Sequence, residues 1–233
     1  MLRKLLIAFV LVGFSIIFFN IYSTYETKTE LTGIAQHYAE KGASEVGAPN
    51  LVTAIVVTYR GFDTLGEVTI LFLTASIIAF FLKLKEEDAS KEIVHGETTE
   101  ILVTASQVLI PLTFLFGIFV FINGHLTPGG GFQGGAIIAT GVALMIMANP
   151  NAKINYHVIH WVESISGVSF VLVGILGIVL AGGFLDNKIL GLGTFGDLFS
   201  AGAIPIIYSF VGLKVGAEIS NILSKYQQSQ KEV

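Results

Sequence analysis

Residues 101–122 read ILVTASQVLIPLTFLFGIFVFI, a run of 22 residues without a charged side chain. About 20 mostly apolar residues suffice for a helix to cross the hydrocarbon core of a bilayer. The whole chain of 233 residues agrees, because 53% of it is hydrophobic and only 13% is charged. Soluble domains carry about 25% charged residues. We therefore expect an all-α membrane protein, whose backbone polar groups pair within helices.

Further apolar runs of similar length lie on both sides of this stretch. The first of them follows Arg3 and Lys4, but no small-residue cleavage site of a signal peptide closes it. We therefore count it as a span, and the sequence predicts six transmembrane helices in all. The five runs besides 101–122 are approximately 5–22, 65–82, 131–148, 157–181 and 198–222.

The second span lies inside an apolar stretch that is too long for one crossing. Residues 51–82 would reach about 48 Å as a single helix. The stretch contains RGFDTLGE at residues 60–67, with two glycines and three charged groups. We therefore expect a short helix, a break near Gly61, and then the span.

Two polar connections divide the chain. Residues 25–49 form the first, and the charged run KLKEEDASKEIVHGETTE at residues 83–100 forms the second. The second indicates a domain boundary, with a two-span unit at 1–84, a charged cytoplasmic linker at 85–100 and a four-span unit at 101–233. No internal repeat is evident, which disfavours a self-sufficient transporter built from two halves.

The positive charges predict the orientation of the spans. With the N-terminus inside, eight Lys and Arg residues lie in inner segments, four lie in outer segments, and Lys214 lies within a span. The positive-inside rule then places both termini in the cytoplasm of a multi-pass protein of the cell membrane.

Composition and motifs exclude several classes of function. Cysteine is absent, so neither disulfides nor thiolate-bound iron–sulfur clusters are possible. The net charge is −4 without a basic stripe, which argues against a nucleic-acid partner. His157, His160 and Glu163 lack a further strong ligand for zinc, and no nucleophile motif accompanies the nearby serines. We expect no catalytic residue, no metal and no cofactor.

Ionisable side chains within spans are costly, so each one indicates a possible use. Asp63 and Glu67 are four residues apart on one helix face, and Asp63 is interpreted as part of the helix start. Glu67 is expected to be buried further in, where it is either a proton or cation carrier or a capping group near the positive helix end.

Three more candidates lie in the last two spans. Glu163 follows His160 by one helical step and is either a relay group or a contact for a neighbouring subunit. Lys214 and Glu218 are spaced to pair within one helix. The pair is either self-neutralised and structural or part of ion translocation, and we favour translocation because a desolvated lysine can pass protons.

The segment GHLTPGGGFQGG at residues 124–135 predicts a tight hairpin between the third and fourth spans. A ridge of small residues continues into the fourth span and suits close helix packing in lipid. It consists of Gly131, Gly135, Ala139 and Ala143. His125 is the titratable group of the hairpin, either a proton or cation ligand near the outer surface or a polar residue that closes the turn. The hairpin and packing glycines are Gly129, Gly130, Gly131, Gly134 and Gly135.

Two stretches resemble one family of membrane complexes. GHLTPGGGFQGGAI and the region 101–223 are similar to the MnhB family, the B subunit of multisubunit Mrp-type cation/proton antiporters. AIVVTYRGFDTLGE at residues 54–67 resembles the C-terminal end of the antiporter A subunit, or a small membrane subunit of membrane-bound hydrogenases. The end of the chain, residues 193–218, is closer to the hydrogenase-associated versions. Where this family often has Asn after the hairpin histidine, this chain has Leu126.

The resemblance implies a non-catalytic membrane subunit that takes part in sodium/proton translocation, with Glu67 and His125 as the positions most relevant to ion passage. The implied partners are lipid, Na⁺, H⁺ and other membrane subunits of an Mrp-type antiporter or a membrane-bound hydrogenase complex. The alternative is a purely structural subunit that organises neighbouring ion-channel subunits.

Overall fold

The computed structural model describes residues 2–25, 30–82, 98–150 and 154–229. These residues form helices and connections without a strand, and they divide into two units, residues 1–37 and 38–233. In the first unit, α1 (Leu2–Thr24) presents exposed apolar side chains along most of its length. Residues 85–97 of the predicted charged linker lie outside the described residues.

The described ranges contain six helices that are long and apolar enough to cross a membrane, which confirms the predicted fold class. They are α1 together with α4 (Gly61–Phe81), α5 (Glu100–Ile122), α6 (Gly131–Ala148), α7 (Tyr156–Leu180) and α8 (Ile204–Ser229). The shorter elements are α2 (Ile34–Val46), α3 (Leu51–Thr53), the π-helix η1 (Ala54–Tyr59) and the 3₁₀ turn η2 (Asn187–Ile189).

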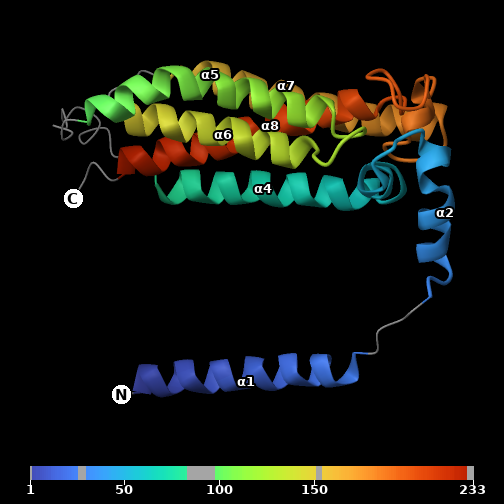
Figure 1. Ribbon diagram of the computed structural model, residues 1–233. Helices are drawn as coiled ribbons and strands as arrows, with labels where there is room; N and C mark the ends of the chain where they lie inside the picture. Colours follow the sequence, from blue (N-terminus) through green and yellow to red (C-terminus); the bar gives the residue numbers. More distant parts are fainter. Residues whose placement is uncertain (1, 26–29, 83–97, 151–153, 230–233) are drawn as a thin grey trace. The chain divides into compact units, whose positions relative to one another are not determined.

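Helix α8 forms the centre of the second unit. Figure 1 shows α4, α5, α6 and α7 running alongside it, and all four pack against it. Within its apolar window 56% of the residues are buried, against 17% for α4 and 22% for α5. Since α8 has neighbours on most of its circumference, its polar side chains are sheltered from lipid within the chain itself.

The predicted break near Gly61 is confirmed. The chain passes from η1 through Arg60, whose φ of −120° and ψ of 37° interrupt the helix, and continues as α4. The Thr64 hydroxyl donates to the Val56 carbonyl at 2.8 Å, which satisfies an acceptor near the break. A Cβ at Gly61 would lie 2.9 Å from the Phe184 carbonyl oxygen, so glycine allows the close approach of two connections.

The structure differs from the sequence-based expectation in two elements. The polar connection 25–49 contains α2, which ends at Val46, and the next residue, Gly47, has a left-handed φ of 75°. The last span begins at Ile204 rather than near Leu198, because the preceding segment forms turns with positive φ at Gly193, Gly196, Ala201 and Gly202. Pro205 then lies in the first turn of α8, where it loses no helical hydrogen bond.

Candidate functional site

A buried ion pair lies in the middle of α8. The Lys214 Nζ donates to Glu218 Oε1 at 2.6 Å, and the two side chains are 10% and 0% exposed. By helical rise, Lys214 is about 15 Å from the start of α8 at Ile204 and about 20 Å from Gln227. The pair therefore lies well inside the apolar span, where either charge alone would be expensive.

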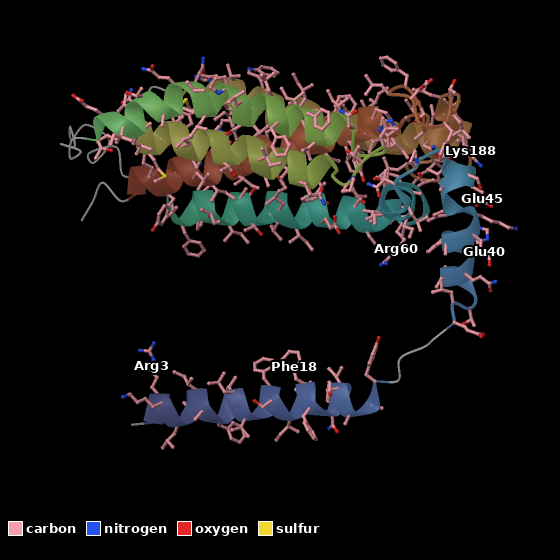
Figure 2. All side chains as sticks on the ribbon, viewed as in Figure 1. Arg3, Phe18, Glu40, Glu45, Arg60 and Lys188 are labelled. Carbon is pink, nitrogen blue, oxygen red and sulfur yellow. The ribbon has the colours of Figure 1, made fainter. Side chains whose placement is uncertain are left out.

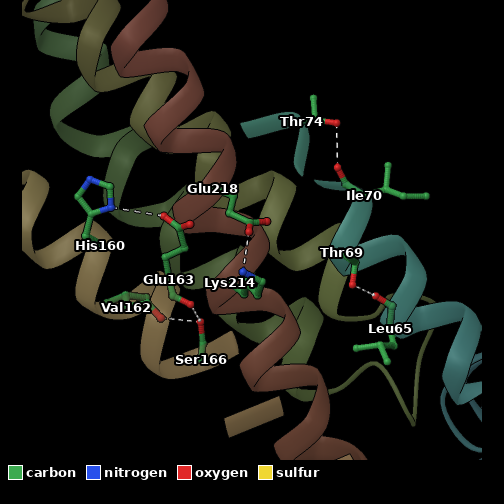
Figure 3. Close-up of polar contacts among 10 residues, drawn as sticks. All are labelled: Leu65, Thr69, Ile70, Thr74, His160, Val162, Glu163, Ser166, Lys214 and Glu218. Atoms are coloured by element: carbon green, nitrogen blue, oxygen red, sulfur yellow. Dashed lines mark hydrogen bonds and ion pairs between the residues drawn. The ribbon is translucent and has the colours of Figure 1, made fainter. Parts of the chain in front are cut away.

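Helix α7 adds a second carboxylate beside this pair. Glu163 has only 12% of its side chain exposed, and its carboxylate lies near the Lys214–Glu218 pair (Figure 3). Its Oε2 is 3.7 Å from Nδ1 of His160, too long for a hydrogen bond, while His160 is 58% exposed. A Cβ at Gly167 would meet the Lys214 stem at 3.3 Å, so glycine lets α7 lie against the lysine. The arrangement places a lysine and two carboxylates together.

A cavity of about 480 Å³ opens beside this cluster, between α4, α7 and α8. Its lining is mainly apolar, from residues such as Leu65, Val68 and Phe72, with Lys214 and Glu163 as its charged members. The Lys214 Nζ lies 5.0 Å from the centroid of the Phe72 ring, within the range of a cation–π contact. One side of the cluster therefore faces this cavity, at the level of the membrane-spanning helices.

The expected burial of Glu67 is wrong. Glu67 is exposed on the surface of the chain, because the buried face of α4 consists of Gly61, Thr64, Val68 and Ala75, and residue 67 lies one step off this line. Asp63 is also exposed and pairs with Arg60 at 2.5 Å in the first turn of α4. Asp63 and Glu67 are thus not gathered with Lys214 and Glu218.

His125 lies in the hairpin between α5 and α6 and is fully buried. Its Nε2 is 3.4 Å from the Asp197 carbonyl oxygen, and its own carbonyl accepts from the Asn50 backbone N–H at 3.0 Å. Burial lowers the pKa of His125. These contacts to two other connections favour the interpretation as a residue that closes the turn. Leu126 donates its backbone N–H to the Asn123 carbonyl within the same turn.

The glycine segment holds three helices close together. A Cβ at Gly131 would lie 2.7 Å from Val211, one at Gly135 would lie 2.7 Å from the Gly212 oxygen, and one at Gly134 would lie 2.6 Å from the Gly117 oxygen. Gly131 and Gly135 thus face α8, and Gly134 faces α5. In the turn before α6, Gly129 and Gly130 have φ values of 157° and 155°, which side chains rarely allow.

A further polar group joins α2 to η1. The Tyr59 hydroxyl donates to the Glu45 carboxylate, and burial together with this bond raises the pKa of Tyr59 to about 12. Figure 2 shows Glu45, Arg60 and Lys188 near the same end of the second unit. In the ranges that the structure describes, no three His, Cys, Asp or Glu side chains gather as a metal site would require.

Sequence reasoning missed two polar residues of α8, Asn221 and Ser224. They are 6% and 0% exposed, and Asn221 lies on the same helix face as Lys214 and Glu218. The sequence does contain a pattern that indicates them, because polar residues continue past Glu218 at helical spacing. It was hidden because serine and asparagine near the end of a span are also typical of an interface with water.

The chain is similar to proteins of a known family. A domain described as related to the MnhB subunit of Na⁺/H⁺ antiporters matches residues 101–221, which is more than half of the chain. The chain belongs to this MnhB-related family. A second family, MbhE, is described as one of the subunits of MBH and matches residues 2–97. The second match contains α1 and α4, and the first runs from α5 into α8.

Relatives of this MnhB-related chain include proteins of similar length. It is 32% identical over 195 residues to an uncharacterised protein of Methanocaldococcus jannaschii, covering 74% of each chain. It is 36% identical to a chain of the membrane-bound sulfane sulfur reductase, an archaeal respiratory membrane complex, with a TM-score of 0.83 and coverage of 97% and 98%.

A third similarity concerns the fold alone. A chain in the Mrp complex from Dietzia sp. DQ12-45-1b matches with a TM-score of 0.77 and 23% identity. The match covers 96% of the MnhB-related chain but only 26% of that larger chain. The same arrangement of helices therefore also occurs as one part of a longer polypeptide.

Proposed function

We propose that this chain is a non-catalytic membrane subunit of an Mrp-type sodium/proton antiporter module attached to a respiratory membrane complex. The MnhB-related family and the similarity to a chain of the sulfane sulfur reductase complex over nearly its whole length support this role. The observation that carries a translocating role is the Lys214–Glu218 pair, buried in mid-span with Glu163 beside it.

The cluster has the groups that proton transfer requires. Lys214 donates to Glu218, so a proton reaching either carboxylate can shift the charge balance of the pair without moving the backbone. Glu163 borders both the pair and the cavity between α4, α7 and α8. The cavity gives the cluster a lateral route towards a neighbouring subunit. We assign proton relay to Lys214, Glu218 and Glu163.

The domain division and the orientation are part of the proposal. The two family matches, 2–97 and 101–221, meet at the charged segment, which supports a two-span unit at 1–84 joined by a linker at 85–100 to a four-span unit at 101–233. The eight-to-four split of Lys and Arg supports cytoplasmic termini.

Transport by the assembled complex tests the relay. Glu218→Gln keeps the side-chain size and removes the carboxylate, and we expect sodium-dependent proton movement in vesicles to fall at least about tenfold per assembled complex. Glu163→Gln should reduce it as well. The control is Thr140→Val, which removes an exposed hydroxyl of α6 that donates to the Ala136 carbonyl within its own helix. Wild-type exchange in Glu218→Gln would leave the chain a purely structural subunit.

A further inference from the structure

Four buried polar atoms of α7 and α8 lack a hydrogen-bond partner among the residues that the structure describes. They are Glu163 Oε2, Glu218 Oε2, Asn221 Oδ1 and Ser224 Oγ. Three of the four belong to α8, in side chains that are at most 6% exposed. A buried polar group without a partner is costly, and in lipid the cost is not recovered from outside. Four such atoms on two packed helices therefore indicate an occupant that supplies hydrogen bonds.

The α8 groups are arranged as a line. Lys214, Glu218 and Asn221 are spaced i, i+4 and i+7, so they share one helix face, and Ser224 follows one step later. Neighbours at this spacing have Cβ atoms about 5–6 Å apart, which one bridging water spans. Ten residues of helix cover about 15 Å. The line therefore reaches from mid-span towards the end of α8.

The end of the line lies near the membrane surface. Gln227 is half-buried, and its Nε2 donates to the Pro150 carbonyl at 3.1 Å in the turn after α6. Ser224 is thus within one helical turn of a polar connection. At the other end, Lys214 and Glu163 border the cavity between α4, α7 and α8.

We propose that a water-filled path runs inside the bundle along α8 from Ser224 past Asn221 and Glu218 to Lys214, and supplies protons to the relay. This path extends the proposed function, and it rests on that function for the direction in which protons move. A proton suits the path because the oxygens occur about one per turn, whereas a hard metal cation takes six or more oxygens around one point.

The charged groups along the path belong to two helices. Lys214, Glu218 and the half-buried Lys225 are on α8, while Glu163 and His160 are on α7. Of the other helices that pack on α8, α6 has no titratable residue, α5 has only Glu100 at its start, and both acidic residues of α4 are exposed. A proton that enters beside Ser224 passes Lys225 at the entrance and then meets Glu218 as the first carboxylate on the line.

Cysteine labelling tests whether the path contains water. The chain has no cysteine, so label found on this subunit reports the introduced cysteine alone. Asn221→Cys and Ser224→Cys are placed in the intact complex in vesicles and treated with a small charged methanethiosulfonate, which needs the hydrated thiolate. Two controls are Ile222→Cys, beside Asn221 at the same depth, and Val215→Cys, which is 1% exposed and packs against α6.

We expect the two path cysteines to react at least tenfold faster than both controls. Equal and slow reaction at all four positions would overturn the path. Asn221→Leu, which keeps the branched shape of the side chain but removes its polar atoms, should also reduce proton movement at least tenfold while the complex assembles, and unchanged movement would overturn the path as a proton route. Rapid labelling with full transport in Glu218→Gln would instead refute the proposed relay, so the two failures are distinguishable.

Discussion

The hydroxyl of Tyr208 in α8 donates a hydrogen bond to the hydroxyl oxygen of Thr53 in α3, with 2.9 Å between the two oxygens. Thr53 in turn donates to the Gly124 carbonyl at 2.7 Å. Both side chains are buried. The central helix, the broken segment and the glycine hairpin are thus joined at one point, although Tyr208 and Thr53 are 155 residues apart in sequence.

We expect Tyr208→Phe to destabilise the folded chain by about 1 kcal/mol, because it removes one buried hydrogen bond. Thr53→Val removes two and should cost about 2 kcal/mol. The double variant should be no less stable than Thr53→Val alone, since both changes share one bond. Thermal unfolding in detergent measures all three, and fully additive losses would contradict the connection.

Gly135 tests the contact between α6 and α8. An alanine there would place its Cβ 2.7 Å from the Gly212 backbone oxygen, so the helices must separate, at a cost of about 1–3 kcal/mol. Gly66→Ala is the control, because a Cβ at that position meets nothing within 4 Å. We expect the yield of assembled complex to fall for Gly135→Ala and to persist for Gly66→Ala. Equal yields would contradict the close packing.

His125 predicts a pH dependence of stability. Burial lowers its pKa, so the folded chain binds fewer protons there than the unfolded chain. The contribution of neutral, buried His125 to the free energy of unfolding is complete above the ordinary histidine pKa of 6.5. It is lost as the pH falls from 6.5 through the lower pKa that His125 has in the folded chain. We expect the unfolding temperature to drop as the pH falls below about 6.5, and His125→Gln to flatten this drop. His157→Gln, at an exposed position, should retain it.

Glu67 remains a candidate despite its exposure. A carboxylate on the outer face of a span is expensive in lipid, so we expect a polar group of a neighbouring subunit to cover it. Glu67→Gln should allow assembly while sodium-dependent proton movement per complex falls strongly, and Glu67→Asp should retain part of it. Thr74→Val, on an exposed part of the same helix, serves as the control. Unchanged exchange in Glu67→Gln would reduce the residue to a helix-start group.

The orientation of the spans is open to labelling. Cysteines in place of Ser44 and Ser229 should react with an impermeant reagent from opposite sides of the membrane, because an odd number of spans separates them in the six-span arrangement. The Ser229 site should be the cytoplasmic one if the positive-inside rule holds. Reaction of both from one side would contradict the topology.

The spans and the break at Gly61 follow from sequence because each depends on local properties, namely the length of an apolar run and the charges and glycines that interrupt it. The Lys214–Glu218 pair follows for the same reason, since helical spacing alone brings the two together. The start of α8 at Ile204 did not follow, because an apolar turn and an apolar helix have the same composition.

The burial of individual polar groups could not be predicted in the same way. Glu67 and Glu218 both occur within spans, yet one is exposed and the other fully buried, since this depends on which face of each helix meets its neighbours. Helix packing is a property of several segments at once. The burial of Asn221 and Ser224 likewise depends on the helices that surround α8.

The central position of α8 also has a consequence for biogenesis. A ribosome delivers helices to the membrane in order, so α4 to α7 are inserted before the helix around which they pack. Until α8 arrives, the helix face that carries Gly131 and Gly135 meets lipid or an insertion factor. Arrival of α8, rather than entry of any earlier helix, is then the step at which this subunit acquires its core and becomes fit for assembly.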